Sequence, residues 1–287
     1  MEREISKKKK LNAASHEPMR FFITFIESFS IFILTYLLLF YCTNYLTLVI
    51  AKFYGAEGEL HYYGIKWITS GNSLAWNKGS VITIFSSAPF VCLILAGLMY
   101  QIFLRLNRVH YLFRLSVVWM FLHGFVYFFG AYIAGVISRT GFWYASAFIN
   151  ISFVFEIIMA IACAAGSIML SKPVIRLFLA SAYLSQSRKS EMQKKFVLIQ
   201  IVFPWFLGSL FVILIKLSRI ELHEIILLSS YSLFLIFFFF FDKKPILIPD
   251  WMLVKKYIKK KTHRIYLIRY ILFFIAVIVL VFFRLRF

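Results

Sequence analysis

Charged residues are scarce in this sequence. Only 15% of its 287 residues are charged, whereas 62% are hydrophobic. Soluble domains contain roughly 45–50% apolar residues, and a soluble chain of this length could not bury so much apolar surface. The composition therefore excludes a soluble globular class and indicates that a lipid bilayer is the solvent.

Cysteine is also scarce and is placed without pattern. The three cysteines, Cys42, Cys92 and Cys163, all fall inside apolar runs. No CxxC pair and no Cys/His cluster occurs, so the sequence predicts neither a disulfide framework nor a metal site. We expect these residues to be small buried side chains in helix packing, and we expect no cofactor.

Catalytic motifs are missing as well. The strings that begin at His16 and His223 resemble the start of HExxH but lack the second histidine, without which a helix cannot present two imidazoles to one metal. No P-loop, no GxSxG elbow, no pair of carboxylates on one helix face and no internal repeat is found. These absences favour a protein that is not an enzyme.

Acidic residues are few, so the net charge is +20. Clustered Lys and Arg attract nucleic-acid phosphates, but here the basic residues lie in short segments between apolar runs. Positive residues in such segments set the orientation of a membrane protein. We therefore expect no nucleic-acid partner, and we expect the basic loops to contact anionic lipid headgroups.

The apolar runs predict an all-α polytopic integral membrane protein with seven transmembrane helices, and six as the alternative. A basic cytoplasmic tail, 1–20, precedes a single transmembrane domain, 21–287. The first run is longer than a signal-peptide core of about 7–15 residues, so we expect it to remain as an anchor. The predicted spans are about 21–50, 81–104, 115–137, 142–170, 196–217, 225–241 and 265–283.

The basic residues predict the orientation. With the N-terminus cytoplasmic, the inner side receives 24 of the 32 Lys and Arg residues, and the bias has the same direction at every loop. The outer connection between spans five and six is a short turn of mixed charge that contains Lys216 and Glu224. We expect a multi-pass protein of the bacterial inner (cell) membrane.

Two ionisable residues lie inside predicted spans, His123 in span three and Glu156 in span four. An ionised carboxylate is costly in hydrocarbon, and antiparallel neighbouring spans would bring both residues to the middle layer. We expect them to form a polar centre, with Asn150 as a further hydrogen-bond partner. This centre is either a proton-coupled or substrate-binding site or a structural clasp between helices. Glu27 and Gln200 are secondary candidates.

Other residues bear on packing. Small residues, among them Gly124 and Ala160, predict close contact between spans three and four. Pro89 and Pro204 predict helix kinks.

Segments outside the spans carry further expectations. The segment 171–195 has apolar residues at helical spacing, which predicts an amphipathic helix on the membrane surface. The outer connection 51–80 is rich in Gly, Trp and Tyr. It predicts a hairpin that turns at Gly71–Asn72 and acts as an interfacial anchor or, alternatively, as a ligand-recognition lid.

Three functions are compatible with these patterns. The first is a non-enzymatic subunit or scaffold that joins other membrane-protein subunits. The second is a small-molecule or ion permease that uses the His123/Glu156 centre. The third is an intramembrane enzyme in which His123 is an acid or a base.

Overall fold

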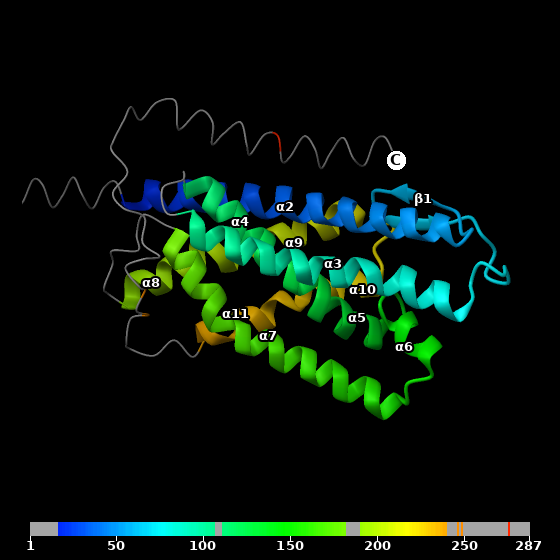
Figure 1. Cartoon of the computed structure of the whole chain (residues 1–287). Coiled ribbons are helices and arrows are strands. Elements are labelled where there is room, and N and C mark those ends of the chain that lie inside the picture. The colour runs from blue at the N-terminus through cyan, green and yellow to red at the C-terminus, as the bar shows by residue number, and fades with distance from the viewer. Residues whose placement is uncertain are drawn as a thin grey trace, which may run out of the picture.

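The computed structural model describes residues 17–106, 111–181 and 190–239, together with Ile246, Ile248 and Ile275. Most of these residues are helical, and the long helices lie roughly side by side (Figure 1). Five helices are long and apolar enough to cross a membrane: Phe21–Phe53, Lys78–Arg105, Tyr111–Ser138, Phe153–Ser181 and Glu191–Lys216. The prediction of an all-α membrane protein is confirmed.

The first five predicted spans each overlap one of these helices. The sixth, 225–241, overlaps a shorter apolar helix, Leu222–Ile236, which consists of α10 (Leu222–Ser229) and most of α11 (Tyr231–Phe239). The seventh, 265–283, lies outside the described residues apart from Ile275, and so does the tail up to residue 16. The number seven therefore stays a prediction.

The first helix, α2 (Glu17–Phe53), packs against three other helices. It contacts α3 (Lys78–Arg105), α4 (Tyr111–Phe125) and α9 (Phe203–Lys216) (Figure 1). Its side chains Phe32, Ile33 and Tyr36 are completely buried. Since lipid is as apolar as a protein core, close van der Waals packing rather than hydrophobicity holds this helix in the bundle.

The third apolar span is continuous but not uniformly α-helical. It runs from α4 through the π-helical segment η1 (Val126–Gly130) into α5 (Ala131–Ser138). At Gly124 it lies directly against α3, because a Cβ there would be only 2.7 Å from the carbonyl oxygen of Cys92. The close approach predicted for the small residues is therefore present at Gly124, but the neighbour there is the second apolar span.

The predicted fourth span, 142–170, is placed wrongly along the chain. A short helix, α6 (Trp143–Ile149), ends at Asn150, whose backbone is left-handed with φ of 61°. The spanning helix α7 begins only afterwards and covers Phe153–Ser181. The break at Asn150 shifts the span about ten residues towards the C-terminus, as the bounds of α7 show.

The surface helix predicted in 171–195 is also wrong where the structure describes it. Val174, Ile175 and Phe178 belong to α7 and are completely buried, in a helix that packs against α4 and α11. A stripe of apolar residues looks the same in sequence whether it faces lipid or other helices, which is why the periodicity was compatible with both. Residues 182–189 lie outside the described part of the chain.

The two prolines within predicted spans are accommodated differently. Pro89 lies inside α3, which continues on both sides of it. Pro204 is the second residue of α9, which directly follows the π-helical segment η3 (Leu198–Val202); η3 in turn follows α8 (Ser190–Val197). Proline lacks a backbone donor, and the change from π to α geometry lies next to that missing donor.

A hairpin forms in the connection between α2 and α3. Strand β1 (Gly58–His61) pairs antiparallel with β2 (Gly64–Trp67), and the turn is Tyr62–Tyr63. The hairpin was predicted, but its turn was expected at Gly71–Asn72. Gly64 closes the turn with φ of 146°, a conformation that glycine adopts readily.

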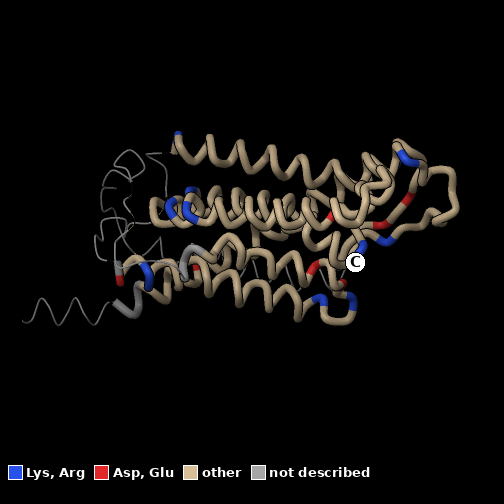
Figure 2. Tube along the Cα trace, turned by 90° about the horizontal axis from the view of Figure 1, so that it is seen from below, with Lys and Arg blue, Asp and Glu red and all other residues tan. Residues whose placement is uncertain are grey.

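The two ends of the bundle differ in what they carry. One end, called the hairpin end below, contains β1, β2 and α6 (Figure 1). The opposite end contains α8 and is called the α8 end (Figure 1). Lysines and arginines of the described chain gather near these ends, with long uncharged stretches of helix between them (Figure 2). This distribution is that of a protein whose middle layer lies in hydrocarbon.

Candidate functional site

A cavity of about 350 Å³ lies at the hairpin end. Its walls come from α2, α3, η1, α5, α6, α10, the hairpin and the loop between α5 and α6. Aromatic side chains supply much of the lining: Tyr36, Phe40, Tyr63, Trp67, Phe85, Tyr127, Phe142 and Tyr144. The polar lining consists mainly of Thr43, Asn44, Thr47, Thr140, Glu221, His223 and Glu224.

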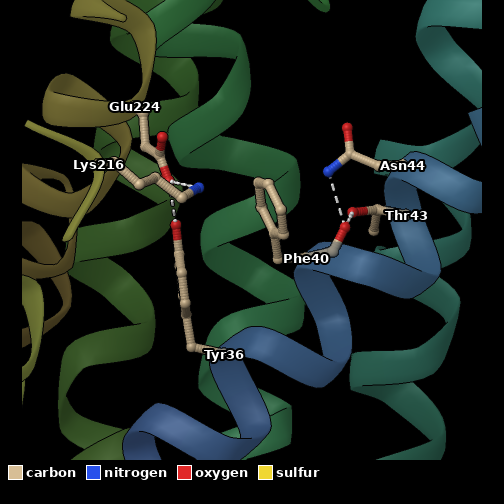
Figure 3. Close-up of polar contacts among 6 residues, drawn as sticks. All are labelled: Tyr36, Phe40, Thr43, Asn44, Lys216 and Glu224. Carbon is tan, nitrogen blue, oxygen red and sulfur yellow. Dashed lines mark hydrogen bonds and ion pairs between the residues drawn. The ribbon is translucent and has the colours of Figure 1, made fainter. Parts of the chain in front are cut away.

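A buried ion pair borders this cavity. Nζ of Lys216 lies 2.6 Å from Oε1 of Glu224, and the two side chains are only 4% and 10% exposed (Figure 3). The hydroxyl of Tyr36 donates a hydrogen bond of 2.8 Å to the same carboxylate oxygen. Because burying two charges is costly, such a pair persists only when geometry and further hydrogen bonds are good; here Tyr36 supplies the further bond.

The Lys216 ammonium has a second partner. It lies 3.6 Å from the centroid of the Phe40 ring, within the range of a cation–π contact. Figure 3 shows Phe40 between the ion pair on one side and Thr43 and Asn44 on the other. Phe40 therefore separates the two groups of polar side chains on this part of the cavity wall.

Local structure explains how the pair forms. Lys216 is the last residue of α9, and Glu224 lies in the first turn of α10. A cation at a helix C-terminus and a carboxylate at a helix N-terminus both interact favourably with the helix dipole. The turn between the helices is tight, with the amide of Arg219 bonded to the carbonyl of Lys216 at 2.7 Å. The short connection between α9 and α10 and the positions of the two residues at the helix ends together bring the charges into contact.

Thr43 and Asn44 turn back onto their own helix. The hydroxyl of Thr43 and the amide nitrogen of Asn44 donate to the carbonyl of Phe40 at 3.0 and 2.7 Å (Figure 3). Both side chains also line the cavity. These bonds fix their rotamers, so the polar wall is held before any ligand arrives.

His223 lines the cavity beside the ion pair. Its Nδ1 lies 3.3 Å from the hydroxyl of Ser138 at the end of α5. Gly141 is next to its ring, where a Cβ would lie 3.0 Å from Cε1. Gly141 has φ of 62°, so this turn passes the imidazole in a conformation that favours glycine.

His123, the first predicted site residue, lies deeper and does not line the cavity. Its side chain is completely buried. Nδ1 lies 2.5 Å from the hydroxyl of Tyr231, while Nε2 lies 2.9 Å from the hydroxyl of Thr35 and 3.2 Å from the carbonyl of Phe32. Both ring nitrogens are thus engaged in links among α4, α2 and α11.

Glu156, the second predicted site residue, has different partners. Its carboxylate binds Nη1 of Arg139 at 2.8 Å and accepts a 2.8 Å hydrogen bond from Nε1 of Trp143. The structure does not bring Glu156 and His123 together. The helix break at Asn150 puts Glu156 in the first turn of α7, beside the loop that carries Arg139, instead of in the middle layer.

The remaining predicted residues are dispersed. Asn150 is exposed and ends α6. Glu27 is buried in α2. Gln200 is buried in η3, and its backbone carbonyl accepts a hydrogen bond from the hydroxyl of Ser28. None of these three residues lines the cavity. Of the two prolines predicted to kink helices, Pro89 lines it and Pro204 does not.

The sequence contained a signal for the ion pair that the prediction did not use. Lys216 and Glu224 flank a short connection between two apolar runs, which the sequence predicts to be an outer turn of mixed charge. An acid at the start of one helix and a base at the end of the preceding one is the pattern that allows them to meet.

Similarity to known proteins adds nothing to this geometry. No protein-family model, no curated protein and no solved structure matches the chain. The cavity and its ion pair therefore carry the functional argument.

Proposed function

We propose that the protein is a permease of the bacterial inner membrane, with a cytoplasmic N-terminus and the hairpin end outside, which binds a small polar molecule in the cavity. One observation carries this proposal. A buried Lys216–Glu224 pair borders a cavity that is walled by elements from residue 36 to residue 227. Ligand sites are typically concave, largely apolar and equipped with a few well-placed polar groups.

The hairpin fits this proposal. Tyr63, Gly64, Ile65 and Trp67 all line the cavity, which supports the ligand-recognition role over the anchor role for the connection 51–80. The proposed polar centre differs from the one predicted from the sequence at His123 and Glu156. It now lies at Glu224 and Lys216, and the two residues predicted for it serve helix packing.

Paired variants test the proposal in lipid nanodiscs. Lys216→Met/Glu224→Gln removes both charges of the cavity pair, so neither is left buried alone. Arg139→Gln/Glu156→Gln removes the Arg139–Glu156 pair, which does not line the cavity. We expect a panel of amines, sugars and carboxylates to include a compound that raises the unfolding temperature of the wild type and of the control variant, but not of the cavity variant.

Two outcomes would contradict the proposal. In the first, no compound of the panel stabilises the wild type. In the second, both double variants lose the response equally, which would trace it to general destabilisation. Ligand-dependent flux in proteoliposomes then separates a permease from a protein that only binds.

A second function, a subunit or scaffold of a membrane assembly, is favoured by α7. Around Glu156 its outer half exposes apolar side chains on most sides, including Phe153, Phe155, Ile158 and Ile161. A protein with this role is expected to co-purify with a stable membrane partner in mild detergent. A monodisperse preparation without a partner, together with ligand binding in the cavity, would favour the permease.

A further inference from the structure

The charges on the cavity wall have one sign. Glu221 and Glu224 both line it, whereas no lysine or arginine is among its lining residues, all of which belong to the described chain. Lys216 pairs with Glu224 but is only 3% exposed and is not a lining residue. Lys216 offsets the charge of Glu224, so Glu221 is the lining carboxylate whose charge is available to a ligand, and a ligand with a negative charge would meet it without a basic group on the wall to attract it.

The aromatic residues add a second preference for positive charge. The hairpin side of the wall is a connected cluster of rings, with centroids 6.1 Å apart for Trp67 and Phe85 and 4.9 Å apart for Phe85 and Tyr144. Faces of Trp, Tyr and Phe attract cations, and aromatic enclosures are the usual way in which proteins recognise quaternary ammonium groups.

Lys216 is an internal example of this recognition. Its ammonium group is held by the carboxylate of Glu224 at 2.6 Å and by the Phe40 ring at 3.6 Å (Figure 3). A carboxylate and a ring thus hold an ammonium group away from water here, with Tyr36 bonded to the same carboxylate. Glu221, which is exposed, and the ring cluster both line the cavity, so the same two kinds of group are available there to a ligand.

We infer that the ligand of this cavity is a small organic cation, a protonated or quaternary amine, whose charge is recognised by Glu221 and the Trp67–Phe85–Tyr144 rings. This inference rests on the proposed function, because it names the ligand class of the same cavity. It excludes anions as ligands and predicts that neutral isosteres bind weakly.

The experiment compares choline with 3,3-dimethylbutan-1-ol, which has the same shape without the charge. The full chain in nanodiscs is titrated with each compound and with glucose and acetate, and binding is followed by the unfolding temperature. We expect saturable binding of choline and an affinity for the neutral isostere lower by about 10-fold or more, the size of one desolvated cation–π contact.

Matched carboxylate variants assign the effect to the cavity. Glu221→Gln is expected to weaken choline binding by about 5-fold, a typical size for one exposed charge contact. Glu59→Gln removes another exposed carboxylate, one of the hairpin that does not line the cavity, and it should leave the affinity unchanged. Because both residues are exposed, neither variant threatens folding.

The outcomes separate the two proposals. Equal binding of choline and its neutral isostere, or binding of glucose or acetate without choline, overturns the cation inference and leaves a ligand-binding cavity. Equal loss in Glu221→Gln and Glu59→Gln overturns the assignment to Glu221. Failure of every compound to bind overturns the proposed function and the inference together.

Discussion

Gly208 of α9 lies against the ring of Phe32 of α2 so closely that a Cβ on the glycine would be 2.4 Å from Cδ1 of the phenylalanine. Phe32 is completely buried and also contacts the rings of Trp119, His123 and Tyr231. Its ring therefore has little freedom to move. The contact fixes the separation of two spanning helices and bears directly on stability.

Gly208→Ala is expected to destabilise the protein by about 1–3 kcal/mol, the usual cost of overfilling a packed core. Thermal unfolding in nanodiscs measures the effect. Gly97→Ala in α3 is the control, since nothing lies within 4 Å of a Cβ at that position. Equal stability of the two variants would show that α9 can shift away from α2 without cost.

A second close approach joins η1 to the end of α10. A Cβ on Gly130 would lie 2.1 Å from the hydroxyl oxygen of Ser230 and 3.1 Å from its Cβ. Gly130→Ala should therefore destabilise the protein by about 1–3 kcal/mol. Adding Ser230→Ala removes the nearer atom and should restore part of the loss, so a double-mutant cycle provides the measurement. Purely additive losses would contradict this contact.

Breaking the buried ion pair should cost more than removing it. Lys216→Met alone leaves the Glu224 carboxylate buried, and loss of one partner of such a pair typically costs about 3–5 kcal/mol. Lys216→Met/Glu224→Gln leaves no buried charge and should be more stable than the single variant. Unfolding of the two variants in parallel is the test, and a single variant as stable as the double would mean that water reaches Glu224.

The links of His123 should affect stability but not ligand binding. Tyr231→Phe removes the hydroxyl beside Nδ1 and leaves a buried ring nitrogen without that partner, at a cost of about 1–3 kcal/mol. Tyr45→Phe, at a tyrosine that is 64% exposed, should have no effect. Since His123 does not line the cavity, the ligand response of the Tyr231→Phe protein should match the wild type. Loss of that response with retained stability would return His123 to the functional centre.

The positions of spans one, two, three and five followed from the sequence, because a helix needs about 20 apolar residues to cross hydrocarbon and such runs are visible. Helix ends inside these runs were not predictable in the same way. Asn150 adopts a left-handed conformation in the middle of an apolar stretch, and this one residue decides that Glu156 meets Arg139 instead of His123.

The candidate site was less predictable for a related reason. In a membrane protein, residues that face lipid and residues that face other helices are both apolar, so pattern alone does not give helix rotation. Lys216 and Glu224 look like solvent-exposed loop residues because their burial depends on Tyr36 and Phe40, far away in the chain. The aromatic connection 51–80 was recognisable, but its turn used Tyr62–Tyr63, which carries no strong turn signal.

The cavity walls come from both early and late parts of the chain, from Tyr36 in α2 and from Glu224 and Leu227 in α10. During synthesis, the first spans enter the membrane long before the residues that complete the cavity exist. Tyr36 and the hairpin are therefore made before Glu224, the carboxylate that Tyr36 contacts in the folded protein. The cavity is consequently completed late in synthesis, and a chain that stops before residue 222 lacks His223, Glu224 and Leu227 of its wall.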